Sequence, residues 1–325
     1  MPTCRAGAPV TVLDPGPNES SAAPRGGPDP FAEVRTMQAS EVARAATAAR
    51  TIVSDLGLGV EVAEVIHNSN NLALRLLPCD VFARVAFDGR EIAQREIELA
   101  VRLTEAGSPI ATLEPRVEPR VYEHDGFAMT LWTFYESIVE PDVSPVDYAT
   151  TLRRLHAGMR NLDIATQHFT DRVAEAQQLV ENPDLTAALS GADRDLLTST
   201  LRDRRRAIED RGASEQLLHG EPHPGNVLNT RDGLRFIDLE TGCRGPIEFD
   251  LAHVPEAVSD LYPKVDRDLL RECRVLVLAM VAAWRWDPSD ELPNGERAGR
   301  HLISALRAGP PWPTLEAVMS PLSGP

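Results

Sequence analysis

The sequence predicts an α+β protein of two lobes, a small β-rich N-terminal lobe over residues 34–135 and a larger, mainly helical C-terminal lobe over residues 136–325. In the first region, strand-like runs lie on both sides of one helical segment. In the second region, helical periodicity dominates and one short hairpin interrupts it. A chain of 325 residues is long enough to bury a sizeable core.

The N-terminal region begins with a segment that lacks the residues of a core. Residues 1–33 are rich in Pro, Gly, Ser and Ala and poor in large apolar side chains, so we expect a disordered tail. Residues 40–58 then predict a helix, because alanines fill its interior, Ser40 suits an N-cap and Gly57 suits a stop.

The rest of the small lobe combines strands with one helix. Asp125-Gly126 separates two strand-like runs within residues 120–136 and predicts a hairpin, since Asp-Gly is among the strongest hairpin signals. Further strands are predicted over residues 60–66, 72–77 and 81–87, and a helix over residues 90–107.

The C-terminal lobe is predicted to be mostly helical. A hairpin over residues 226–240 turns at Asp232-Gly233 and is the exception. The predicted helices span residues 148–159, 169–180, 193–210, 268–284 and 294–309.

Composition excludes several classes of function. The net charge of −16 argues against a nucleic-acid partner, because a phosphate backbone is usually bound by a basic face. No apolar run is long enough to span a bilayer, and the N-terminus lacks the pattern of a secretory signal, so no membrane association is expected. Without a CxxC pair, the cysteines fit reduced thiols in a cytoplasmic protein. They are Cys4, Cys79, Cys243 and Cys273.

The stretch HGEPHPGN, residues 219–226, gathers two histidines, a glutamate and an asparagine. His219 and His223 have the four-residue spacing of zinc ligands on a helix. However, Pro222 and Pro224 exclude a regular helix there, because each lacks an N–H and clashes with the preceding turn. We therefore expect a rigid loop rather than a zinc site.

The hairpin that follows suggests a chemical role for this loop. Asn226 starts its first strand and Asp238 ends its second, so antiparallel pairing returns both side chains to the same end. An amide oxygen beside a carboxylate suits Mg²⁺, a hard cation with oxygen ligands. Glu221 lies five residues before Asn226. This order of acid, asparagine and later aspartate is that of protein-kinase phosphoryl transfer, where the first acid orients the hydroxyl and the other two residues hold metal.

The segments HGEPHPGN, FIDLE and GPIEFDLA, together with LRRLHAG around His156, resemble the aminoglycoside phosphotransferase family of kinase-like enzymes, which includes choline-kinase-like enzymes. The resemblance covers about residues 60–260. It implies a bilobal protein-kinase-like fold. It also implies an ATP- and Mg²⁺-dependent transfer of the γ-phosphate to a hydroxyl of a small molecule, such as an aminoglycoside, an amino alcohol or a sugar.

The resemblance also implies roles for individual residues. Glu221 occupies the position of the family's catalytic aspartate, and Asn226 and Asp238 occupy those of its metal ligands. Glu240 is a further candidate for a contact with the metal, and Asp250 is expected to support the loop from below.

Two residues depart from the family's pattern. Glu221 is one methylene longer than aspartate, which could displace the carboxylate by roughly 1 Å, and a misplacement of that size can cost about a hundredfold in rate. Arg84 stands where the family has a lysine that holds the nucleotide phosphates and pairs with a helix glutamate. Glu96 is its expected partner, and Glu98, on a different helix face, is the competing one. A surface arginine on an edge strand is the alternative for Arg84.

The remaining nucleotide contacts are expected from two short stretches. The glycine-free loop at residues 67–71 would cover the phosphates with its backbone, with Ser69 and with Asn70, and a plain hairpin turn is the alternative. The stretch with Trp132 and Thr133 would form a hinge with backbone contacts to adenine. At least one aromatic residue of this stretch is expected in the core instead.

The acceptor is expected between the loop and the C-terminal helices. Asp260, Asp266 and Asp268 would attract an amine there, which makes a cationic acceptor a candidate. Because basic residues are interspersed among them, a mixed, solvated surface is the alternative.

A second function also fits the glycine-free loop: a pseudokinase-like regulatory protein that binds nucleotide without phosphoryl transfer. The pair of metal-ligand candidates favours the transferase.

Overall fold

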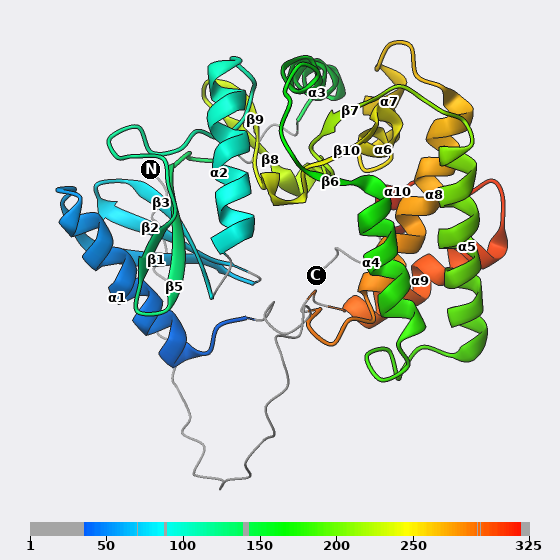
Figure 1. Cartoon of the computed structure of the whole chain (residues 1–325), viewed down its shortest axis with the longest axis horizontal. Coiled ribbons are helices and arrows are strands. Elements are labelled where there is room, and N and C mark those ends of the chain that lie inside the picture. The colour runs from blue at the N-terminus through cyan, green and yellow to red at the C-terminus, as the bar shows by residue number, and fades with distance from the viewer. Residues whose placement is uncertain are drawn as a thin grey trace, which may run out of the picture. The chain divides into compact units, whose positions relative to one another are not determined.

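In the computed structural model, a five-stranded antiparallel sheet forms the N-terminal lobe and helices form most of the C-terminal lobe (Figure 1). The expected tail at residues 1–33 lies outside the described part of the chain. The structure describes residues 36–69, 71–87, 90–138, 143–290, 292 and 294–319.

Buried and partly exposed side chains alternate along the strands, so the two faces of the sheet differ. In β3, Val81, Ala83 and Val85 are buried on one face, and Phe82 and Arg84 lie on the other. The strand order is β1-β2-β3-β5-β4. The bounds are Val60–Asn68 for β1, Leu72–Pro78 for β2, Val81–Phe87 for β3, Tyr122–His124 for β4 and Phe127–Thr133 for β5.

Helix α1, Ala39–Asp55, covers the apolar face of the sheet (Figure 1). Ala49 and Val53 of the helix share one buried cluster with Leu74 and Met129 of the sheet. Burying this face removes enough apolar surface from water to hold the helix on the sheet.

The start of α1 corrects one prediction, because Gln38 and not Ser40 is the N-cap. Glu41 accepts a hydrogen bond from the backbone N–H of Gln38 at 2.7 Å, and this bond places Ser40 inside the first turn. Gly57 follows the helix with φ of +79°, the conformation expected of a helix stop.

The opposite face of the sheet adjoins helix α2, Arg90–Glu105, which contacts β5 and the short helix η2, Leu239–Thr241, of the C-terminal lobe. The segment after α2 is bonded to both lobes. Ala111 N–H donates to the carbonyl of Phe236 at 2.9 Å, and the carbonyl of Thr112 accepts from Thr133 N–H at 3.0 Å. Arg84 therefore lies on the face that borders the C-terminal lobe.

Helix α8 forms the centre of the C-terminal lobe and packs against α4, α5, α6 and α9. None of the described helices is both long enough and apolar enough to cross a membrane. The helices are α3 Pro145–Met159, α4 Phe169–Glu181, α5 Gly191–Glu209, α6 Ile247–Leu251, α7 Glu256–Asp260, α8 Arg267–Trp284, α9 Gly295–Ala308 and α10 Leu315–Met319, with the short helices η1 Pro224–Asn226 and η2 Leu239–Thr241. The strands are β6 Gln167–His168, β7 Glu215–Leu218, β8 Val227–Thr230, β9 Gly233–Phe236 and β10 Cys243–Pro246.

Candidate functional site

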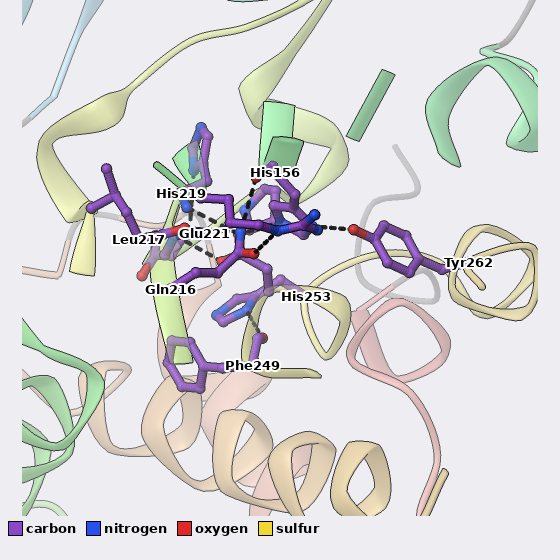
Figure 2. Close-up of polar contacts among 12 residues, drawn as sticks. His156, Gln216, Leu217, His219, Glu221, Phe249, His253 and Tyr262 are labelled. Atoms are coloured by element: carbon purple, nitrogen blue, oxygen red, sulfur yellow. Dashed lines mark hydrogen bonds and ion pairs between the residues drawn. The ribbon is translucent and has the colours of Figure 1, made fainter. Parts of the chain in front are cut away.

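One buried carboxylate holds the loop that follows β7. Asp250 accepts hydrogen bonds from the backbone N–H of His219 at 2.9 Å and of Gly220 at 2.8 Å. It also accepts from the His156 ring at 2.9 Å, and the other nitrogen of that ring is hydrogen-bonded to the Tyr262 hydroxyl at 2.7 Å (Figure 2). Burial acts to raise the pKa of Asp250, but the bond from His156 and the nearby histidines together outweigh it, and the pKa is lowered. Asp250 thus supports the loop as expected.

The ring of His219 connects this loop to the hairpin. Its Nε2 lies 2.9 Å from the carbonyl oxygen of Ile237, which can only accept, so Nε2 carries the proton. Its Nδ1 then accepts from the backbone N–H of Glu221 at 3.4 Å. Burial lowers the pKa of His219, which keeps the ring in this neutral form. The ring therefore joins Glu221 to the residue before Asp238.

Gly220 is required by the shape of the loop. Its φ is +92°, and a Cβ at this position would lie 2.1 Å from the carbonyl oxygen of Thr241. We expect Gly220→Ala to lower the free energy of unfolding by about 3 kcal/mol, because a backbone clash adds to the strain of positive φ.

The control is Gly126→Ala, where φ is +79° and a Cβ would have no atom within 4 Å. It is expected to cost about 1 kcal/mol from strain alone. Urea unfolding of both variants measures the difference, and equal losses would refute the clash.

Glu221 extends from this loop toward a buried arginine of α4. Arg172 donates from Nη2 to Oε1 of Glu221 and from Nη1 to the carbonyl oxygen of Gly220, the latter at 3.1 Å. Burial acts to raise the pKa of Glu221, but Arg172 and then His253 outweigh it and lower the pKa to about 2. The carboxylate is therefore ionised at neutral pH and held in one direction.

The hairpin β8–β9 brings Asn226 and Asp238 to the same end. Ile237 N–H donates to the carbonyl of Asn226 at 3.0 Å, so Asp238 lies one residue beyond this bond. The Asn226 side chain donates from Nδ2 to the carbonyl of Glu221 at 3.0 Å, which leaves Oδ1 as the acceptor end of the amide. Asp238 has φ of +65°, and this costs a non-glycine residue about 1 kcal/mol. Such strained residues cluster at functional sites.

Arg84 lies between three carboxylates. Its Nη1 is 2.5 Å from Oε1 of Glu96. Its Nη2 is 3.1 Å from Oδ1 of Asp238 and 3.0 Å from Oε2 of Glu240. Glu98, the competing partner from the sequence, is exposed on α2. Arg84 thus connects the sheet and α2 to the end of the hairpin.

This cluster contains more negative than positive charge. Burial and then Asp238 raise the pKa of Glu240 to about 7, although Arg84 acts to lower it. Burial also raises the pKa of Glu96 against the effect of Arg84. A divalent cation would supply the missing charge, and carboxylate and amide oxygens fit Mg²⁺. Within the described residues, no group of three or more His, Cys, Asp or Glu side chains could hold a metal.

The residues that the sequence predicts to contact the nucleotide lie in different environments. Trp132 is 6% exposed, and its indole N–H donates to a threonine hydroxyl of the same strand at 2.8 Å, so it belongs to the core. The backbone N–H of Thr133 is bonded to the carbonyl of Thr112. Ser69 is half-buried in a tight turn, where its N–H donates to the carbonyl two residues later at 3.4 Å. Asn70 lies outside the described residues.

The three acids considered for an amine lie apart from Glu221. Asp260, Asp266 and Asp268 are at least half-exposed, and each pairs with an arginine, at 2.6, 3.0 and 2.8 Å. They lie before or at the first turn of α8, whereas Trp284 at its far end is 5.2 Å from the guanidinium of Arg172. An 18-residue helix spans about 27 Å. These acids form the mixed, solvated surface.

Two neighbours of Glu221 have no counterpart among the residues predicted from the sequence. Arg172 lies within the apolar stripe of α4, between Phe169 and Val173. A charged residue on the apolar face of a predicted helix is the signal that would have revealed it. His253, whose Nδ1 lies 2.9 Å from the carbonyl of Phe249, carries no such signal.

The phosphotransferase enzyme family matches this chain over residues 34–286, which is more than half of its length. The choline kinase LicA from Streptococcus pneumoniae is 16% identical, with a TM-score of 0.58 over 80% of this chain and 98% of that one. Aminoglycoside 2'-phosphotransferase-IIIa in its GDP complex is 16% identical, with a TM-score of 0.62 over 81% of this chain and 97% of that one. The amicoumacin kinase hAmiN, in complex with AMP-PNP, Ca²⁺ and Ami, is 9% identical, with a TM-score of 0.62 over 83% and 96%.

A search of curated proteins gave no significant match. The fold, the loop and the hairpin agree with the family match. The chain belongs to the phosphotransferase enzyme family, and its fold is bilobal and protein-kinase-like.

Proposed function

We propose that the protein is an ATP- and Mg²⁺-dependent phosphotransferase that moves the γ-phosphate to a hydroxyl of a small molecule. The supporting observation is a continuous set of contacts around one point. The carbonyl of Glu221 accepts from the side chain of Asn226, and Asp238 beside it pairs with Arg84. An acid, two metal-ligand candidates and a candidate cation for the phosphates thus lie together and come from both lobes.

Each residue has a distinct task in this reaction. Glu221 orients the acceptor hydroxyl, whose oxygen forms a bond to the γ-phosphorus while the bond to the bridging oxygen of ADP breaks. The hydroxyl proton passes to Glu221 late in this step and then to solvent. Arg84 binds the α- and β-phosphates. Asn226 and Asp238 hold the metal, which neutralises charge on the phosphates when bound.

The ligands of structural neighbours agree with this choice of cosubstrates. The amicoumacin kinase binds AMP-PNP and Ca²⁺, and a spectinomycin phosphotransferase binds ADP and spectinomycin. Choline kinase and ethanolamine kinase, by their names, act on amino alcohols. We propose a hydroxylated amine or sugar as the acceptor.

Replacement of Asp238 by alanine tests the metal site. We expect Asp238→Ala to weaken Mg·ATP binding by more than about tenfold. Removing a residue that only hydrogen-bonds to a metal ligand already lowers metal affinity by about that much, and Asp238 is proposed as a ligand itself. Calorimetry with Mg·ATP measures the affinity. ADP release is then assayed over a panel of hydroxylated amines and sugars.

A control removes a carboxylate that also pairs with an arginine but lies outside the site. Asp260→Ala is expected to keep the wild-type affinity, because Asp260 is exposed on the surface near α8. Equal affinity in wild type and Asp238→Ala would reject the metal site. Binding by wild type with no ADP release for any acceptor would favour the pseudokinase-like function instead.

A further inference from the structure

We infer that Arg172 is a positioning residue for Glu221, and that the pairing of these two residues explains the glutamate at the position of the family's aspartate. The inference rests on the proposed function, since it assumes that Glu221 orients the acceptor hydroxyl. It adds a residue outside the loop that controls where this carboxylate points.

Arg172 is held rigidly from three directions. It is 4% exposed, although arginine is rarely buried without a partner. Its guanidinium donates to the Gly220 carbonyl and to Glu221, and lies 5.2 Å from the centre of the Trp284 ring. Because the fork of a guanidinium is planar and its donors are fixed, the two bonds set one orientation. Arg172 therefore connects α4, the loop and the end of α8.

The contacts of Arg172 act on both the backbone and the side chain of the loop. The N–H of Gly220 is held by Asp250 at 2.8 Å, and its carbonyl is held by Arg172 at 3.1 Å. The peptide groups on either side of Gly220 are thereby fixed, and the next residue is Glu221. The same guanidinium then holds the carboxylate of Glu221.

The length of the glutamate matches this arrangement. Aspartate at position 221 would withdraw the carboxylate by about one C–C bond, roughly 1.5 Å. A charge-assisted hydrogen bond does not survive such a lengthening, because hydrogen bonds end near 3.5 Å. Aspartate would therefore lose Arg172 while the loop stayed in place. In this chain, glutamate keeps the bond.

Other ionisable groups lie around Glu221 and Arg172, but none of those considered takes the place of Arg172 as the cation paired with Glu221. His253 has a buried Nε2 that finds no hydrogen-bond partner among the described residues, and burial lowers its pKa to about 4, so the ring is neutral at neutral pH. Arg285 is paired with Asp290 at 3.2 Å. Besides Arg172, the ionisable groups that interact with Glu221 include His223, His253 and Arg285. Besides Glu221, those that interact with Arg172 include Glu175 and Cys243.

A double-mutant cycle on the rate of ADP release tests the inference. The variants are Glu221→Asp, Arg172→Met and the two combined, assayed with the best acceptor of the panel or with water in its place. In the native background, Glu221→Asp is expected to lower kcat by about a hundredfold with the KM for ATP unchanged. In the Arg172→Met background, the same change is expected to cost less than about tenfold, because the bond it breaks is already gone.

Rescue by the conservative variant supplies a second readout that a purely structural role would not change. Arg172→Lys keeps the charge but not the fork, so it is expected to restore only part of the kcat that Arg172→Met loses.

The control Arg204→Met removes a comparable arginine, which pairs with Glu272 at 2.6 Å and lies 6.0 Å from the Trp312 ring. It is expected to leave kcat unchanged. Mg·ATP binding by each variant shows that it is folded. If the costs of the two substitutions multiply and Arg172→Lys restores none of the lost kcat, the inference is wrong and the proposed function stands. If wild type neither binds Mg·ATP nor releases ADP, the proposed function fails and the inference fails with it.

Discussion

Asp250→Ala is expected to lower the free energy of unfolding by about 4 kcal/mol or more, because it leaves several buried donors without an acceptor. Asp250 is fully buried and accepts from His219, Gly220 and His156. Each unsatisfied buried donor costs about 1–3 kcal/mol. Since two of these donors are backbone groups of the loop, ADP release is expected to fall together with stability. Urea unfolding measures the first effect.

The control is Asp268→Ala, because Asp268 is exposed and its ion pair with Arg271 lies within one helix. Exposed pairs of this kind contribute about 0.5 kcal/mol or less. A loss in Asp250→Ala no larger than in Asp268→Ala would contradict the role of Asp250 in holding the loop.

The same carboxylate makes stability depend on pH. The pKa of Asp250 is below its usual value in the folded state, and that of Glu221 is about 2. The unfolded chain therefore binds more protons in acid, and stability rises with pH. The contribution is complete above the unfolded pKa of about 4 and is lost as pH falls through the folded value. Asp250→Ala should flatten this dependence, and parallel curves for variant and wild type would contradict it.

The elements that could be predicted from the sequence are those in which the hydrophobic pattern repeats over many residues, and those marked by a strong turn signal. The predicted helix at residues 268–284 is α8, Arg267–Trp284, because many apolar positions repeat along it. The predicted turn at Asp232-Gly233 joins β8 and β9. Helices α6, α7 and α10 have five residues each, too few to show a helical period.

The site could be predicted where it is local in the sequence and not where packing creates it. Glu221 and Asn226 stand in one motif, and a short hairpin returns to Asp238. Arg172 is 49 positions from Glu221, and their contact depends on how α4 packs beside the loop. An amine site at the acids near α8 stays a prediction, and each of these acids is paired with a nearby arginine.

Arg84→Met is expected to abolish ADP release and to destabilise the fold by about 3–5 kcal/mol, the cost of removing one partner from a buried ion pair. Glu96 is 4% exposed and would lose its cation, and Asp238 and Glu240 would repel each other without it. Arg84→Lys restores one charge but not the fork that contacts all three acids, so we expect an intermediate loss. The control is Arg75→Met on the neighbouring strand, where the pair with Asp80 is partly exposed and a much smaller loss is expected.

The pH dependence of Arg84→Met distinguishes loss of charge from loss of packing. Burial already raises the pKa of Glu96 and, together with Asp238, that of Glu240 to about 7. Removing Arg84 raises both further, so the folded variant binds more protons than the unfolded chain between pH 5 and 8, and stability falls as pH rises. Unfolding measured at both pH values should show a larger deficit at the higher one. Mg²⁺ with ATP should reduce that deficit, because a bound cation beside Asp238 supplies the missing charge. A deficit that is equal at both pH values and insensitive to Mg·ATP would mean that the arginine acts by its volume, and that the carboxylates around it do not form a metal site.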